Sequence, residues 1–237
     1  MKAYQIADLK VNMQVSGRAA AQGEKYKVSD LPFEDADITI LVPPKQIERY
    51  QEKHPGMTAD AAEYYLSGYE FYKHLLDHNG CFLHASAVCL DEKAYLFSAE
   101  CGVGKSTHTS MWLKAFPNAF ILNDDKPAIR MIDDRFFAFG TPWSGKTDQN
   151  VARKVPLQAI CFIERGDHNR ICPISAAEAI GKFIPQTYNF HFVGNCFQQL
   201  LSLLDCYFSR HTAYRLECLP NVDAAILSHN VLKEIRV

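Results

Sequence analysis

Residues 99–106, with the sequence Ala-Glu-Cys-Gly-Val-Gly-Lys-Ser, constrain the fold more than any other part of this 237-residue chain. They match the phosphate-binding pattern G-x-x-x-x-G-K-S/T at every fixed position except the first, where Ala99 replaces glycine. The apolar residues 93–97 before the loop predict a buried strand, and residues 106–114 after it predict a helix. This order brings backbone N–H groups and the positive end of a helix to a phosphate. We therefore expect a nucleotide site here rather than an ordinary glycine-containing turn.

Each residue type in the loop suits one contact with a nucleotide. Backbone N–H groups are expected at the β-phosphate, the Lys105 ammonium at the β- and γ-phosphates, and the Ser106 hydroxyl on Mg²⁺. Ala99 fits if its φ is negative, whereas a positive φ would cost on the order of 1 kcal/mol and weaken the loop. The residues expected to bind the nucleotide are Cys101, Gly102, Val103, Gly104, Lys105, Ser106 and Thr107.

The cysteines of the chain are expected to be reduced thiols. Eight are present, without a C-x-x-C pair or a His/Cys spacing typical of a metal site. Cys101 alone lies in the phosphate loop, where two interpretations stay open. It is either a passive loop residue or a thiol made reactive by the helix N-terminus and Lys105.

Charge and hydrophobicity exclude several functional classes. The 25 basic and 27 acidic side chains leave a formal net charge of −2 without a basic run, so neither nucleic acid nor a membrane surface is an expected partner. A hydrophobic content of 48% is enough for a substantial core. The N-terminus lacks a signal-like apolar stretch, and no later apolar run reaches bilayer-spanning length. We expect a soluble cytoplasmic protein with small-molecule or protein partners, and a homo-oligomer stays open.

Two parts are predicted along the chain. Residues 1–80 read as a small β-rich part, with a strand near residues 38–42, breaks at Pro43-Pro44 and at residues 54–56, and a closing helix that starts after Thr58. Residues 81–237 read as a nucleotide-binding domain. Its strands follow one another without helices between them, which favours antiparallel pairing. The predicted strands are 81–90, 93–97, 119–122, 128–132, 136–139, 157–164, 171–174 and 214–218, and the predicted later helices are 175–183, 194–208 and 222–232.

Two adjacent carboxylates, Asp124 and Asp125, follow the apolar residues 120–122 and so stand at the end of a predicted buried strand. Neighbouring side chains of an extended chain point to opposite sides, so the two can serve different tasks. One could reach Mg²⁺ beside Ser106, and the other could accept the proton of an attacking hydroxyl. A solvated Asp-Asp turn is the alternative.

Three further groups of residues are candidates for chemistry. His84 lies in an apolar predicted strand, where it could orient a carboxylate, touch a phosphate, or be a hydrogen-bonded core histidine. Residues 140–146 (GTPWSGK) suggest a mobile loop that closes over phosphates, with Lys146 adding positive charge; a surface turn is the alternative. His74 and His78 share a helical spacing but lack the glutamate of an H-E-x-x-H zinc site, so we do not expect a metal there.

Four segments then occur in the order that a known family shows: residues 84–88 (HASAV), 98–108, 122–126 (LNDDK) and 140–146. Together they resemble the P-loop family of HPr kinase/phosphorylase, whose fold is similar to the nucleotide domain of ATP-dependent phosphoenolpyruvate carboxykinase. The chain is most similar to HPr-kinase-related proteins that are often found beside peptide-modification gene clusters. The resemblance covers about residues 81–157.

The resemblance implies an α/β P-loop kinase domain with a mixed, largely antiparallel sheet, a small β-rich N-terminal part and C-terminal helices. It implies that Lys105 and Ser106 hold phosphates and Mg²⁺, that Asp124 is the base for a substrate hydroxyl, that Asp125 helps to bind the metal, and that His84 supports the pair. Ala99 departs from the family glycine. Residues 1–80 resemble neither the N-terminal domain of HPr kinase nor the larger carboxykinase, so HPr itself is not the expected substrate.

The expected function is therefore a Mg²⁺- and ATP-dependent kinase that acts on a hydroxyl of a peptide, a protein or a small molecule. An ATP-binding regulatory or maturation protein with little turnover is the alternative, and Ala99 is the feature that favours it. A carboxykinase-like decarboxylation is disfavoured because the chain is short.

Overall fold

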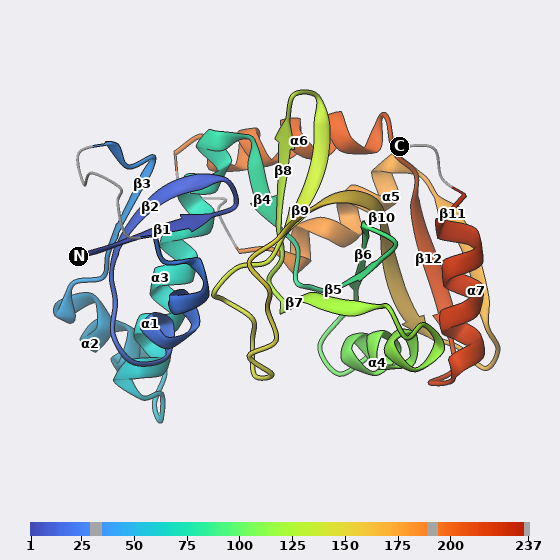
Figure 1. The fold of residues 1–237 in the computed structure, drawn as a ribbon, viewed down its shortest axis with the longest axis horizontal. Helices are drawn as coiled ribbons and strands as arrows, with labels where there is room; N and C mark the ends of the chain where they lie inside the picture. Colours follow the sequence, from blue (N-terminus) through green and yellow to red (C-terminus); the bar gives the residue numbers. More distant parts are fainter. Residues whose placement is uncertain (29–34, 189–193, 235–237) are drawn as a thin grey trace.

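The computed structural model describes residues 1–28, 35–188 and 194–234 and contains two sheets (Figure 1). A three-stranded sheet lies with its helices at the N-terminal end, and a nine-stranded sheet organises the remainder. The N-terminal elements are β1 Lys2–Ile6, β2 Leu9–Gln14, α1 Gly17–Gly23, η1 Glu24–Tyr26, β3 Ile38–Leu41, α2 Pro44–Lys53, α3 Ala59–Leu75 and η3 Leu76–His78. The later elements are β4 Gly80–Phe82, β5 Ala85–Leu90, β6 Lys93–Ser98, α4 Lys105–Ala115, β7 Phe120–Asp125, β8 Ala128–Ile132, β9 Arg135–Phe139, β10 Lys154–Arg165, β11 Arg170–Ile174, α5 Ala176–Phe183, η4 Ile184–Gln186, α6 Cys196–Phe208, β12 Ala213–Cys218 and α7 Val222–Leu232.

The N-terminal part is more helical than its sequence suggested. β1 and β2 form an antiparallel hairpin, and the expected strand near residues 38–42 is β3, which pairs parallel to β2. Pro43-Pro44 was expected to be a break, but Pro44 begins α2. Proline suits the first position of a helix, because its missing N–H would have no partner there. The helix expected after Thr58 is α3, which Thr58 caps by accepting a hydrogen bond from the Ala61 N–H over 3.2 Å.

The large sheet is mixed and largely antiparallel, as expected. Its strands run in the order β4-β8-β9-β10-β6-β5-β7, while β12 pairs with β10 and with β11. Among the described strands of this sheet, only the pairs β10–β6 and β10–β12 are parallel. The long strand β10 pairs with β9 through its first three residues and with β6 and β12 beyond them, so it links the two halves of a curled sheet.

The strand expected over residues 81–90 is in fact two strands. β4 pairs with β8 in one half of the sheet, and β5 pairs with β6 and β7 in the other half. His84 lies at the bend between them, where its backbone N–H donates to the Gln186 carbonyl over 2.7 Å. Leu83 and the residues on either side of the bend are buried. The apolar pattern therefore continues through the bend and conceals it.

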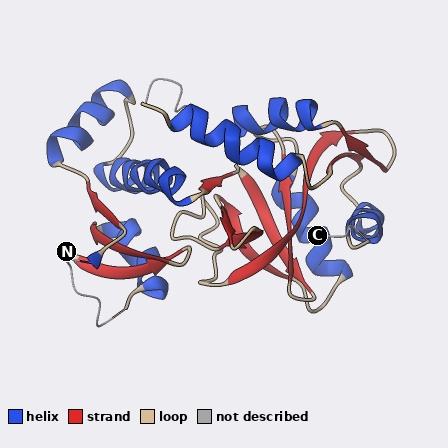
Figure 2. Ribbon diagram, turned by 90° about the horizontal axis from the view of Figure 1, so that it is seen from above, coloured by secondary structure: helices blue, strands red, loops and turns tan. Residues whose placement is uncertain are grey.

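Helices cover opposite faces of the sheet, and the alternation along each strand shows which residues meet them. Along β10, Ile160 and Phe162 belong to a core cluster that includes α5 and α6, whereas Ala159 and Cys161 belong to a second cluster with α4. α4 packs beside α7 (Figure 1). Figure 2 shows helices on both sides of the strands of the large sheet. The first cluster also takes in residues of the N-terminal sheet, so one apolar core continues from that sheet to α6. No described helix is long and apolar enough to cross a bilayer.

Candidate functional site

Residues 99–106, called the phosphate loop below after their sequence motif, have the predicted setting, since they connect the buried strand β6 to the start of α4. Gly102 and Gly104 have φ angles of 79° and 130°, which other residues rarely adopt. Arg165, at the end of β10, donates from Nη2 to the Gly102 carbonyl over 2.9 Å and so fastens the loop to the sheet. The two later glycines of the motif are therefore required by backbone geometry.

Ala99 carries no such requirement. Its φ is not in the left-handed region, unlike those of Gly102 and Gly104. Its side chain is 5% exposed and belongs to the cluster that contains Phe97 and Trp112. In this conformation the methyl group is buried in the core without backbone strain, so the penalty that a positive φ would have carried does not apply.

Lys105 and Ser106 begin α4 and reach back toward the loop and across to β7. The Lys105 ammonium donates to the Ala99 carbonyl over 2.8 Å. Burial lowers the pKa of Lys105, and the nearby carboxylates of Asp125 and Asp124 only partly offset this effect. The Ser106 hydroxyl lies 3.4 Å from Asp124 Oδ1 and 3.5 Å from Oδ2. It is thus Asp124, not Asp125, that faces the serine.

The two carboxylates at the end of β7 have different surroundings. Asp124 is buried and accepts a hydrogen bond of 2.9 Å from the Thr147 hydroxyl. Asp125, with a φ of 115°, pairs with His84 Nε2 over 2.9 Å and with the Lys126 ammonium. Burial raises the pKa of Asp125, but the His84 hydrogen bond and the Lys126 charge outweigh it and hold the pKa well below its ordinary value. These contacts therefore favour the ionised form of Asp125.

His84 is held from both sides. Its Nε2 meets Asp125, and its Nδ1 lies 3.2 Å from Gln186 Oε1. A histidine whose two nitrogens are engaged keeps one orientation, and it keeps the neighbouring carboxylate in place. Of the expected uses for His84, the structure supports contact with the carboxylate pair.

Searches among known proteins give little at the level of sequence. No protein-family model matches the chain, and neither does any curated protein. Nineteen chains of solved structures match this chain. One of them is the HPr(Ser) kinase/phosphatase from Coxiella burnetii, which is 10% identical, with a TM-score of 0.35, over 64% of this chain and 93% of that chain. The relationship is a distant structural one, and it assigns no role to any residue here.

Residues 140–146, which were expected to form a mobile loop, are partly buried in the core. Thr141, Trp143 and Ser144 are buried, and the Trp143 ring stacks on Phe71 with 4.9 Å between centroids. Residues 146–149 are exposed, and they include Lys146. The prediction of a closing loop is therefore wrong for residues 141–144, because the aromatic and small side chains there pack against α3. Residues 140–150 are called the site loop below.

Several contacts at the site were not predicted. Lys126 directly follows the carboxylate pair and could have been noticed from that position alone. No sequence pattern predicts the contacts of Thr147 and Gln186, since Thr147 is 23 residues from Asp124 and Gln186 is 102 residues from His84. Distant residues such as these meet only when the sheet curls.

The remaining candidates lie away from the carboxylates or serve packing. Cys101 is exposed. His108 is buried beside Trp112 and Ser228, and burial lowers its pKa to about 4. His74 lies 3.9 Å from Glu70, and His78 falls in η3 beyond the end of α3. Within the described residues, no group of three His, Cys, Asp or Glu side chains could hold a metal ion.

Two cavities border the phosphate loop. One, of about 380 Å³, is lined by Gly104 and Thr107 together with Arg165 and Pro220. The other, of about 460 Å³, begins at Ala99 and extends to Gln186, the partner of His84. Both volumes are in the range of small-ligand sites.

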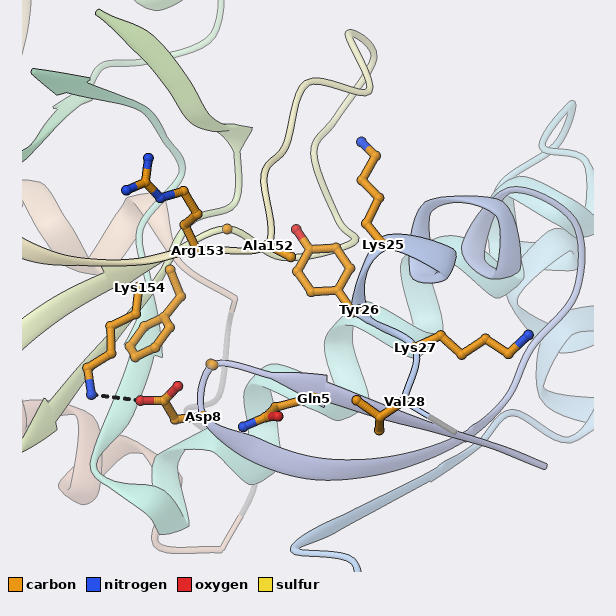
Figure 3. Close-up of a pocket in the computed structure, with 12 residues that line it drawn as sticks. Gln5, Asp8, Lys25, Tyr26, Lys27, Val28, Ala152, Arg153 and Lys154 are labelled. Atoms are coloured by element: carbon orange, nitrogen blue, oxygen red, sulfur yellow. Dashed lines mark hydrogen bonds and ion pairs between the residues drawn. The ribbon is translucent and has the colours of Figure 1, made fainter. Parts of the chain in front are cut away.

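A third cavity, of about 270 Å³, lies between β1 and the start of β10 and contains four cationic side chains (Figure 3). Lys154 pairs with Asp8 over 2.7 Å, and Arg153 pairs with Glu92 over 2.9 Å. Figure 3 shows Lys27 and Arg153 turned in different directions rather than toward a common point. This cavity therefore lacks the convergent charge of a phosphate site.

Proposed function

We propose that the chain is a Mg²⁺-dependent kinase that transfers the γ-phosphoryl group of ATP to a hydroxyl on a peptide, a protein or a small metabolite. The observation that carries the proposal is the convergence of three groups: a phosphate loop, a serine 3.4 Å from one carboxylate, and a second carboxylate 2.9 Å from a histidine. Phosphoryl transfer depends on positioning and on charge neutralisation more than on covalent chemistry, and these groups supply both.

The phosphate loop and Lys105 would bind the β- and γ-phosphates. Lys105 now contacts the Ala99 carbonyl, which it would exchange for phosphate oxygens. The Ser106 hydroxyl and Asp124 offer oxygen ligands on one side of the loop, which suits a cation that keeps several waters and shares phosphate oxygens. Bound Mg²⁺ would neutralise charge on the transferring group.

We assign the metal to Asp124 and the acceptor hydroxyl to Asp125, the reverse of what the resemblance implies. Asp124 faces Ser106, whereas the two oxygens of Asp125 contact the His84 imidazole and the Lys126 ammonium. An aspartate with a low pKa can still orient a hydroxyl, because little bond formation to the nucleophile is needed in a loose transition state. Lys146, on the exposed part of the site loop, would add positive charge near the phosphates.

Two substitutions test the function and the assignment together. Asp124→Asn should raise the Mg²⁺ concentration needed for ATP binding, measured by calorimetry with and without Mg²⁺. Asp125→Asn should bind Mg²⁺ and ATP normally and lose transfer, measured with labelled ATP and a cell extract by mass spectrometry of the products. Asp134→Asn is the control, because Asp134 is an exposed carboxylate in the β8–β9 turn.

Each outcome has a clear meaning. Exchanged phenotypes for the two variants would restore the assignment that the resemblance implies. Transfer at the wild-type rate in both variants would refute the roles proposed for the two carboxylates. ATP binding by the wild-type protein without any phosphorylated product would favour the regulatory alternative.

A further inference from the structure

The N-terminal part reaches the candidate site through Arg18 on α1. Its Nε and Nη2 donate to Asp148 Oδ1 over 3.0 and 2.7 Å, and Nη2 also donates to the Gly145 carbonyl. The guanidinium lies 4.3 Å from the centre of the Tyr64 ring. One side chain thereby joins α1 to Gly145 and Asp148 of the site loop.

Other N-terminal residues hold the buried half of the same loop. The Tyr64 hydroxyl donates to the Pro142 carbonyl over 3.1 Å and accepts from the Ser144 N–H over 2.7 Å. The Tyr26 hydroxyl donates to Asn150 Oδ1 over 3.0 Å. These contacts fix both ends of the loop, and Arg18 is the link to the residues between them.

Those residues contact both carboxylates. Thr147 lies between the two Arg18 contacts and donates to Asp124 Oδ2 over 2.9 Å. Gly145, with a φ of 63°, lies so close to Asp125 that an added Cβ would be 2.6 Å from the Asp125 Cβ. Movement of the exposed half of the loop would therefore disturb both groups.

We infer that Arg18 is a positioning residue: it holds the site loop so that Thr147 orients Asp124 beside Ser106. The inference rests on the proposed function, because it takes Asp124 to be the carboxylate that serves the metal. It extends that function by making the N-terminal part necessary for the geometry of the site. Partners behind a metal ligand typically change metal affinity by about 10- to 100-fold when they are removed.

The alternative to a positioning role is that Arg18 only links the N-terminal part to the rest of the chain. A matched control variant distinguishes these two roles. Lys154 and Asp8 form another ion pair between the N-terminal part and the large sheet, 2.7 Å long and similarly exposed, but outside the site loop. If Arg18 only joined the two parts, Arg18→Ala and Lys154→Ala would have the same consequences.

Hydrogen exchange of the free protein tests the contact itself. Arg18→Ala should increase amide exchange in residues 144–150 several-fold, Arg18→Lys should give a smaller increase, and Lys154→Ala should give none there. Lysine retains the charge opposite Asp148 but lacks the fork that spans two acceptors. Unchanged exchange in Arg18→Ala would overturn the inference.

The Mg²⁺ dependence of ATP binding tests the positioning. Arg18→Ala and Thr147→Val should each raise the half-saturating Mg²⁺ concentration about tenfold, and the double variant should rise no further than the larger single effect. Binding of ATP without Mg²⁺ should be unchanged. Multiplying effects, or a wild-type Mg²⁺ dependence in Arg18→Ala, would overturn the inference. This readout needs no turnover, so an absence of transfer in the wild type would count against the proposed function alone.

Discussion

Ala99→Gly restores the consensus first glycine of the phosphate loop, and the structure predicts that this change weakens the protein without improving the site. The sequence alone suggests the opposite, because the alanine departs from the motif. Yet Ala99 has no positive φ, and its methyl group is buried in the cluster around Phe97 and Trp112. The loop obtains its left-handed conformations from Gly102 and Gly104 instead.

Two effects determine how far Ala99→Gly lowers the free energy of unfolding. Replacing alanine by glycine where alanine is unstrained costs about 0.4–1 kcal/mol through the greater freedom of the unfolded chain. Removing one buried methyl group costs about 0.8 kcal/mol more in lost hydrophobic transfer. The free energy of unfolding should therefore fall by roughly 1–2 kcal/mol, since both effects have the same sign.

Urea unfolding followed by circular dichroism measures the stability change, and calorimetry measures ATP affinity with Mg²⁺ present. We expect a lower urea midpoint, an unchanged dependence of the unfolding free energy on urea concentration, and an ATP affinity equal to that of the wild type. Ala213→Gly is a useful control, because Ala213 is equally buried but lies in β12, away from the loop. A variant that gained ATP affinity about tenfold, with unchanged stability, would show that Ala99 impairs the loop and would refute the reasoning.

Three more changes probe the same loop and helix. Lys105→Ala should reduce ATP affinity at least tenfold, because a charged hydrogen bond is worth about 1.5–3 kcal/mol; calorimetry measures it, and wild-type affinity would exclude Lys105 from the phosphate site. Arg165→Ala removes the tie to the Gly102 carbonyl and, because the pair is exposed, should weaken ATP binding no more than about fivefold in the same titration. His108 has a pKa lowered to about 4 by burial, so protonation favours the unfolded chain, whose histidine has a pKa of about 6.5. Stability should fall by roughly 3 kcal/mol as the pH drops from 6.5 to 4, and His108→Gln should flatten that part of the urea-midpoint profile; an unchanged profile would contradict it.

Most elements of the large sheet could be predicted from local patterns. The β5–β6 hairpin follows from Asp91-Glu92, whose φ angles of 51° and 57° suit a two-residue turn. The phosphate loop and α4 follow from the motif. The bend at His84 could not be predicted, because it depends on where the chain passes from one half of the curled sheet to the other. The start of α2 at Pro44 was not predicted, because a Pro-Pro pair is typical of a break as well as of a helix start.

The members of the site were easier to predict than their contacts. The loop, His84 and the carboxylate pair do meet, since each stands at the end of a buried strand or the start of a helix. Thr147 and Arg18 were not anticipated, because their placement depends on the N-terminal part packing against the site loop. The prediction that residues 141–144 are mobile is wrong for the same reason, because these residues pack against the N-terminal part.

The task of each carboxylate depends on a register that the sequence does not reveal. β7 pairs with β5 so that Asp124 lies opposite Ser86 and Asp125 lies opposite Ala85, and an irregularity occurs between Ala87 and Val88. Ser86 points toward α4, since its hydroxyl lies 3.1 Å from that of Thr109. Residues directly opposite on paired strands share a face, so Asp124 also points toward α4 and Ser106, while Asp125 points away toward His84. A shift of one residue would exchange the faces, and the roles proposed for Asp124 and Asp125 would then be exchanged as well.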